Sequence, residues 1–201
     1  MIEIDIEQGS DEWLEARKGV ISASNFSKFV TVKGDKASTF LASCRELAGE
    51  RLTGERKEIP QNYAMKRGSE LEPEARDYYE DLTGNTVRET GLIYLDERKV
   101  ISCSPDGLMK DKGLEIKCPL FHTHAGYVEG NKVPAGHYQQ VQGCMYVTGL
   151  SQWDYLSYFP HFNVKKLFIS VDRNDEFIEK MADVLEQAND KIESIVNKLR
   201  A

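Results

Sequence analysis

An acid in a turn, followed by an acid and a lysine on a strand, is the pattern in this chain that could do chemistry. The segment Ser104-Pro105-Asp106-Gly107 is followed, nine residues after its acid, by Glu115, and one residue separates Glu115 from Lys117. Alternate side chains of a β-strand share a face, so Glu115 and Lys117 would point the same way, between apolar residues that point into a core. Two carboxylates can bind a hard divalent cation, and a lysine can stabilise an anion or position a water. The spacing therefore predicts metal-dependent cleavage of a phosphodiester.

Each part of the pattern also has an explanation without chemistry. Pro-Asp-Gly is a common β-turn sequence, and alternating Glu and Lys are ordinary on the solvent face of a half-buried strand. A third acid would complete a strong metal site, and Glu72, in the predicted helix just before the strands, is the best candidate. Ser69-x-x-Glu72 could instead be a capping box, although Pro73 would then lack an N–H that normally pairs with the Ser69 carbonyl. Glu70 and Glu74 stay open as alternatives to Glu72.

Length and composition favour one domain, residues 1–201, with a real core, because 40% of the chain is hydrophobic and 29% is charged. The N-terminus does not resemble a signal peptide, and no apolar stretch reaches membrane-spanning length, so we expect a cytoplasmic protein without a membrane partner. The formal net charge is −7, but residues 16–67 hold 11 Lys and Arg against 5 Asp and Glu. This basic region could meet phosphates, or it could be a set of solvated helix faces.

The cysteines and histidines give little sign of a second metal site. The four cysteines form no Cys-x-x-Cys pair, which predicts reduced, structural residues: Cys44, Cys103, Cys118 and Cys144. His122 and His124 follow the last strand of the pattern, and we expect them to be exposed in a loop rather than to bind zinc.

Hydrophobic periodicity predicts a mixed α/β fold, with helices on both sides of a central sheet. We expect helices after Ser10, near Ser22–Ser24, from Ser38 to Gly54, over 70–83, from Pro134 to Thr148, and at the C-terminus. We expect strands at 91–96, 99–104, 107–110 and 113–118, forming an antiparallel meander, and further strands at 153–159 and 166–171.

Five segments together resemble the phage lambda exonuclease family, also called YqaJ-like viral recombinases. They are Trp13–Ser24, Gly68–Arg76, Cys103–Gly107, Leu114–Pro119 and Gln140–Gln142, and they occur in the family's order along nearly the whole chain. The resemblance implies a restriction-endonuclease-like PD-(D/E)xK fold with a central mixed, largely antiparallel sheet. It also implies Mg²⁺-dependent 5′→3′ digestion of one strand of linear double-stranded DNA, with Mn²⁺ as a substitute metal, and a ring-shaped homotrimer.

The resemblance also assigns roles by position. Glu72, Asp106 and Glu115 resemble the family's metal ligands, with the backbone carbonyl of Ile116 as a further ligand. Lys117 resembles the residue that orients and activates the attacking water. These four side chains, Glu72, Asp106, Glu115 and Lys117, would be catalytic.

Two further groups of residues follow from the resemblance. Arg17, Ser24, Ser104 and Gln140 fall where the family holds the terminal 5′-phosphate, while Gln142 and Tyr146 resemble a supporting Gln-x-x-x-Tyr element. Without the resemblance, Arg17 would be read as a cation favoured at a helix C-terminus, and Gln140 and Gln142 as hydrogen-bonding groups at the core edge.

The implied biological role is phage or prophage recombination in the cytoplasm of a bacterial host, with a single-strand-annealing protein as a partner. Another endonuclease or resolvase of the same fold, or a non-catalytic protein that binds DNA ends, are the alternative functions.

Overall fold

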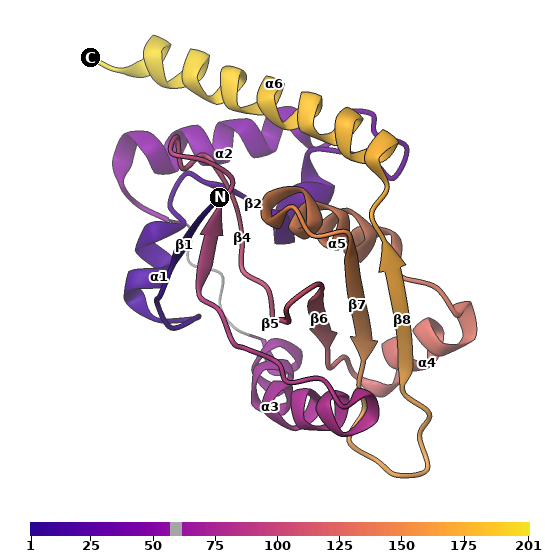
Figure 1. The fold of residues 1–201 in the computed structure, drawn as a ribbon. Helices are drawn as coiled ribbons and strands as arrows, with labels where there is room; N and C mark the ends of the chain where they lie inside the picture. Colours follow the sequence, from indigo (N-terminus) through magenta and orange to yellow (C-terminus); the bar gives the residue numbers. More distant parts are fainter. Residues whose placement is uncertain (57–61) are drawn as a thin grey trace.

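The structure, a computed structural model, describes residues 1–56 and 62–201 and arranges them as two four-stranded sheets with helices around them (Figure 1). The strands are β1 (Ile2–Ile4), β2 (Ile21–Ser22), β3 (Leu92–Tyr94), β4 (Ile101–Cys103), β5 (Gly107–Leu108), β6 (Gly113–Lys117), β7 (Gln152–Ser157) and β8 (Leu167–Asp172). The helices are α1 (Asp11–Ala16), α2 (Phe40–Thr53), α3 (Tyr63–Thr83), α4 (Phe121–Gly130), α5 (Ala135–Thr148) and α6 (Asp175–Leu199), and a 3₁₀ helix covers Ala23–Lys28.

The chain passes from one sheet to the other between β4 and β5. The first sheet has the strand order β1-β3-β4-β2 and the second the order β5-β6-β7-β8. The pairs β3–β4 and β5–β6 are antiparallel as predicted, but the prediction that these four strands form one meander is wrong. Pro105 lies at the break, and because it has no N–H and a fixed φ it cannot continue a strand ladder. Asp106 therefore sits at the junction between the sheets.

Strand β6 is buried on both faces, unlike a strand at the surface of the protein. It pairs with β5 on one side and runs parallel to β7 on the other, with Glu115 opposite Tyr155. Leu114 and Ile116 pack in a cluster with Ala75 of α3. Glu115, on the opposite face, is 0% exposed, so the solvent-face explanation of its alternation with Lys117 is wrong.

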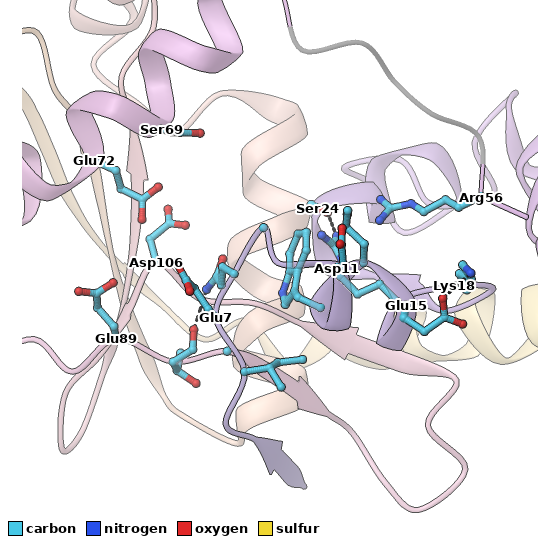
Figure 2. A pocket seen from close by; sticks show the side chains of 18 of the residues that line it. Glu7, Asp11, Glu15, Lys18, Ser24, Arg56, Ser69, Glu72, Glu89 and Asp106 are labelled. Carbon is cyan, nitrogen blue, oxygen red and sulfur yellow. Dashed lines mark hydrogen bonds and ion pairs between the residues drawn. The ribbon is translucent and has the colours of Figure 1, made fainter.

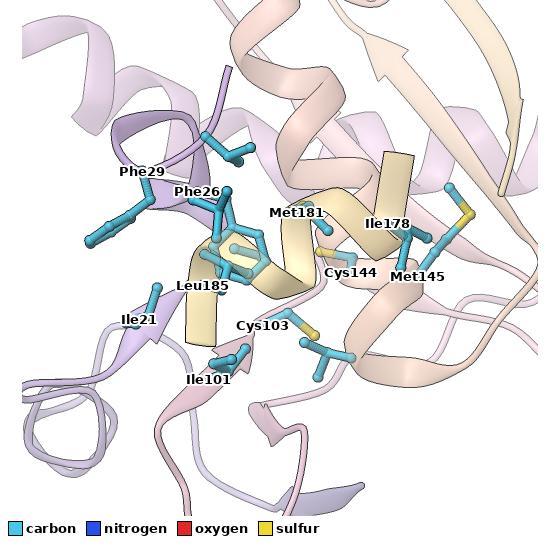
Figure 3. Close-up of a cluster of buried hydrophobic side chains, with 14 of the residues drawn as sticks. Ile21, Phe26, Phe29, Ile101, Cys103, Cys144, Met145, Ile178, Met181 and Leu185 are labelled. Carbon is cyan, nitrogen blue, oxygen red and sulfur yellow. The ribbon is translucent and has the colours of Figure 1, made fainter. Parts of the chain in front are cut away.

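The main core lies between the first sheet, α5, α6 and the 3₁₀ helix. Figure 3 shows Phe26 of the 3₁₀ helix, Cys103 of β4 and Cys144 of α5 gathered beside α6. Helix α6 lies along α2, and the apolar face predicted for it is buried at Met181 and Leu185, among other positions (Figure 1). Burial of this apolar face is the main interaction that holds the 25-residue helix α6 against the core.

Helix starts and ends follow local signals with one large exception. Ser10 caps α1 through its side chain, and α2 and α3 end at the predicted Gly54 and Gly84, both with positive φ. Helix α3, however, begins at Tyr63 after the N-cap Asn62 rather than near residue 70, so the capping box at Ser69 is wrong. The segment predicted near Ser22–Ser24 is a 3₁₀ helix rather than an α-helix.

Helix α4 was not predicted, and it changes the position of the two histidines. His122 is exposed as expected, but His124 is buried, with its ring nitrogens 2.8 Å from Ser157 Oγ and 2.9 Å from the Lys165 carbonyl. The prediction of a loop is therefore wrong for both histidines, and the prediction of exposure is wrong for His124. All four cysteines are free and buried, as predicted. None of the helices in the described part of the chain has the length and apolar character that crossing a membrane needs.

Candidate active site

Strand β6 presents Glu115 and Lys117 on one face, as its alternation predicts. The Lys117 ammonium forms an ion pair with Oε1 of Glu115. The second carboxylate oxygen, Oε2, is buried and has no hydrogen-bond partner among the described residues. A buried carboxylate oxygen without a partner is costly, so this atom indicates a place where a cation or a donor binds.

Asp106 reaches the same place from the junction between the sheets. Its Oδ2 accepts the backbone N–H of Ile116 at 2.6 Å, which fixes the carboxylate next to β6. The predicted convergence of Asp106 with Glu115 and Lys117 is thus present in the structure. Because Ile116 donates this hydrogen bond, the register of β6 sets the position of the Asp106 carboxylate directly.

Helix α3 brings Glu72 to the carboxyl group of Asp106, and Figure 2 shows the two side chains pointing toward one another. Arg76, one turn further along α3, donates to Glu72 Oε1 at 3.0 Å and to the Asp106 carbonyl at 3.4 Å. The two alternative acids point elsewhere. Glu74 accepts from the hydroxyl of Tyr158, and Glu70 forms an exposed ion pair with a lysine of the preceding turn. The geometry therefore favours Glu72 over both.

Burial raises the pKa of all three carboxyl groups. The pKa of Glu115 rises to about 8 and that of Glu72 to about 7, because burial disfavours the charged form and Asp106 adds a repelling charge. Burial likewise raises the pKa of Asp106. For Lys117, burial lowers the pKa, but the carboxylates of Glu115 and Asp106 outweigh burial and raise it above its ordinary value. Lys117 is therefore protonated at neutral pH and acts as a donor.

The donor set fits a hard divalent cation that keeps part of its water shell. Among the described residues, no three His, Cys, Asp or Glu side chains form a group that could hold a metal ion as they stand. Mg²⁺, however, is usually bound through one or two carboxylates together with waters and substrate phosphates. The unpartnered Oε2 of Glu115 and the neighbouring carboxylate of Asp106 match that requirement.

A cleft of about 1730 Å³ opens over this cluster. Figure 2 shows Glu72 and Asp106 at one end of it and Ser24 and Arg56 at the other. Arg17, which donates to Ser24, lines the cleft as well. Acidic side chains outnumber basic ones along the described lining, with Glu7, Asp11, Glu15 and Glu89 among them. Phosphates entering this cleft need a countercharge at its acidic end, which a divalent cation would supply.

Arg17 forms the centre of a cationic pocket at the far end of the cleft. Its guanidinium lies 3.8 Å from the ring centroid of Trp13, and its Nη2 donates to Ser22 Oγ at 2.9 Å and to Ser24 Oγ at 3.1 Å. The indole N–H of Trp13 in turn donates to Ser104 Oγ at 3.0 Å. Three of the four predicted phosphate-binding residues, Arg17, Ser24 and Ser104, are thus connected through one network.

The remaining predicted residues lie on α5. Gln140 is half-buried there and is not among the described residues that line the cleft. The buried Gln142 donates to the Asp172 carbonyl and accepts the Asn174 N–H, both at 2.9 Å, so its amide joins α5 to the turn between β8 and α6. Tyr146 packs against the main core. The contacts of Gln142 and Tyr146 therefore support the fold.

Two residues of this site had no role in the sequence prediction. Arg76 lies four residues after Glu72, and this i, i+4 spacing on a helix was the signal that could have paired them. Trp13 lies four residues before Arg17, and the stacking between them follows from the same spacing at the end of α1. Each residue holds a predicted side chain in place.

Residues 12–151, more than half of the chain, match the YqaJ-like viral recombinase domain. The chain belongs to this family. The family and the mixed α/β fold predicted from the sequence are thereby confirmed, and the exonucleases among its relatives imply a nuclease.

Solved structures agree with this YqaJ-like assignment. An alkaline exonuclease, LHK-Exo, from Laribacter hongkongensis is 31% identical, with a TM-score of 0.87 over 95% of this chain and 96% of the other. Its structure in complex with dAMP, at 32% identity, gives a TM-score of 0.84 over the same shares. A phage-related exonuclease from Haemophilus somnus 129PT is 16% identical, with a TM-score of 0.74 over 90% of this chain and 96% of that one, and shows the fold alone.

A viral relative is much longer. Uncharacterized protein R354 of Acanthamoeba polyphaga mimivirus is 27% identical over 164 residues, which cover 75% of this chain. This YqaJ-like chain spans 29% of that relative, less than a third of its length.

Proposed function

We propose that the protein is a Mg²⁺-dependent 5′→3′ exonuclease that digests one strand of linear double-stranded DNA and leaves 3′ single-stranded overhangs for phage-type recombination. The observation that carries this proposal is the single cleft that joins the carboxyl cluster to the cationic pocket. A strand whose terminal phosphate binds at Arg17 and Ser24 would lay a phosphodiester near Glu72 and Asp106. Holding the strand end and the scissile bond in one cleft supports cleavage that starts from an end.

The side chains divide the chemistry between them. Glu72, Asp106, Glu115 and the backbone carbonyl of Ile116 would hold the cation, which when bound would polarise the phosphate and lower the pKa of a water. Protonated Lys117 would orient the attacking water and donate to the negative charge that develops during an in-line displacement. Mn²⁺, which accepts the same oxygen ligands, is expected to substitute for Mg²⁺.

The assembly that we propose is a homotrimeric ring acting in the cytoplasm of a bacterial host, with a single-strand-annealing protein as partner. The family resemblance supports this assembly, and so does the basic region at 16–67 within an acidic chain. Basic residues facing a central channel and acidic residues facing outward would retain a duplex while repelling unproductive contacts.

The nuclease assay compares linear and circular duplexes, with Mg²⁺ or with EDTA. We expect nucleotides to be released from linear DNA with Mg²⁺ only, and faster from ends that carry a 5′-phosphate than from 5′-hydroxyl ends. Arg17→Ala should lose the preference for phosphate more than it loses basal cleavage, because Arg17 provides paired donors for a phosphate. Cleavage of circular DNA would indicate an endonuclease instead, and binding without cleavage would indicate an end-binding protein.

The ring makes a separate prediction about mass and processivity. At micromolar concentration we expect a solution mass three times that of the 22.8 kDa chain. A ring around DNA makes rebinding intramolecular, so digestion should continue for many nucleotides after an excess of competitor DNA is added. A monomeric mass on DNA, with release after a few nucleotides, would contradict the ring and leave the active-site proposal standing.

A further inference from the structure

The cationic pocket holds a second arginine, Arg56, that the mechanism above does not use. Arg56 follows the end of α2 and lines the same cleft as Arg17 and Ser24. Figure 2 shows its side chain extending toward Ser24. Its Nη1 is buried and has no hydrogen-bond partner among the described residues. Five residues earlier, Arg51 donates to the Gly19 carbonyl, Asn189 and Glu193, although its Nη2 is likewise buried without a partner among the described residues.

Arg17 also has an unused donor in this pocket. Its Nη2 serves the two serines, but its Nε is buried and has no partner in the part of the chain that the structure describes. Two arginines of one pocket thus each keep a buried N–H group unpaired. Such groups are costly unless a ligand accepts from them, and one anionic ligand in this pocket could accept from both.

The two guanidinium groups favour an anionic ligand in the pocket. Burial and the nearby Arg56 cation lower the pKa of Arg17 to about 10, against an opposing effect of Glu50. The Glu50 carboxylate is already engaged, because it accepts the backbone N–H of Gly19 at 2.8 Å. A ligand that places negative charge between the guanidinium groups would remove their mutual repulsion and satisfy their free donors.

We propose that Arg56 is a second phosphate-binding residue, which with Arg17 and Ser24 selects the terminal 5′-phosphomonoester of DNA over an internal phosphodiester or a 5′-hydroxyl end. This inference rests on the proposed exonuclease function and names the residue that gives its end specificity. A phosphomonoester carries a charge of about −1.5 to −2 at neutral pH, whereas a diester carries one negative charge. Two guanidinium groups therefore match the monoester best.

The test measures binding and cleavage of short duplexes that differ only in a 5′-phosphate or a 5′-hydroxyl. Binding is followed by fluorescence anisotropy in EDTA, so that this readout does not depend on catalysis. We expect Arg56→Gln to reduce the phosphate-over-hydroxyl ratio of affinities about tenfold, the size expected for one charge-assisted hydrogen bond. Arg56→Lys keeps the charge but not the paired donors, and should retain part of the ratio.

Arg45→Gln is the matched control. Arg45 is exposed on α2, belongs to the same basic region and does not line the cleft. Arg45→Gln therefore removes the same charge as Arg56→Gln, but it should leave the phosphate-over-hydroxyl ratio of affinities unchanged. If the wild type prefers phosphorylated ends and both Arg56 variants keep its full ratio, the role of Arg56 is refuted while the exonuclease proposal stands. If the wild type itself does not distinguish the two ends, the phosphate pocket as a whole is refuted. Thermal melts of each variant establish that a lost ratio comes from a folded protein.

Discussion

Replacing Lys117 or Asp106 by alanine is expected to slow nucleotide release from linear duplex DNA by about 10²-fold or more. Lys117 is the protonated donor that pairs with Glu115, and Asp106 is the carboxylate fixed by the Ile116 N–H. In our proposal Lys117 donates to charge that develops only during the displacement, and Asp106 holds the cation that would stabilise the same charge, so the loss should appear in kcat rather than in the KM for DNA. The measurement is steady-state release of acid-soluble nucleotides at saturating Mg²⁺ and DNA.

Two controls separate chemistry from structure in this experiment. Asp106→Asn keeps an oxygen that can accept the Ile116 N–H, so the turn should stay in place while the negative charge is lost. Glu72→Gln is compared with Glu70→Gln, whose parent carboxylate makes only an exposed ion pair on the same helix. We expect Asp106→Asn and Glu72→Gln to be inactive and Glu70→Gln to be near normal. Near-normal activity of Lys117→Ala or Asp106→Asn would refute the assignment of this site.

The sequence predicted the half of this site that depends on local geometry. A two-residue period puts Glu115 and Lys117 on one face of any strand, wherever that strand lies. The β5–β6 hairpin returns the chain beside that strand, and the carboxylate of Asp106, just before β5, accordingly accepts the Ile116 N–H. Both relations lie within a dozen residues, so a single sequence contains them.

The burial of Glu115 on β6 depends on segments far away in the sequence, so the local pattern did not predict it. Glu115 is buried because β6 runs parallel to β7 and because α3 and α5 pack against the strand. A local pattern of alternating Glu and Lys looks the same on a surface strand, so solvent exposure was a fair alternative. The division of the predicted meander into two sheets, and the burial of His124 against Ser157, have the same cause.

Polar residues in the pocket were harder to assign than acids on a strand. Arg17 donates to Ser22 and Ser24, at the start of the 3₁₀ helix, and stacks on Trp13 of α1. Gln142 has an amide whose two partners lie about thirty residues away along the chain. For Gln142, tertiary contacts rather than the spacing of residues decide that the side chain supports the fold.

The raised carboxyl pKa values lead to the second large expected effect, a rise of metal affinity with pH. Glu115 and Glu72 have an ordinary pKa of 4.5, which the folded protein raises to about 8 and about 7. A metal ligand must be deprotonated, so a proton has to leave each protonated carboxyl group that binds Mg²⁺. Below about pH 7, each unit of pH should therefore lower the apparent Mg²⁺ affinity about tenfold for every proton displaced. Such a dependence favours activity at alkaline pH.

In the metal-free protein, a rise in pH has the opposite effect, because it lowers the stability of the fold. Because these pKa values are raised on folding, the stabilisation linked to the bound protons is complete below about pH 4.5. It is lost as the pH rises through about 7 and about 8, where Glu72 and Glu115 ionise in the folded protein. The metal-free protein should thus become less stable toward pH 9, and added Mg²⁺, which binds the ionised folded state, should restore its stability there.

Thermal unfolding at pH 6 and pH 9, with EDTA or with Mg²⁺, tests both the rise of Mg²⁺ affinity with pH and the fall of metal-free stability with pH. We expect Mg²⁺ to raise Tm clearly at pH 9 and little at pH 6, and kcat/KM at limiting Mg²⁺ to follow the same direction. Glu115→Gln removes the group whose pKa is raised most and one oxygen ligand, so it should weaken the dependence of the Mg²⁺ effect on pH, whereas Glu70→Gln should not. A Tm increase as large at pH 6 as at pH 9 would mean that the cation does not displace protons from this cluster, and would place the metal elsewhere in the cleft.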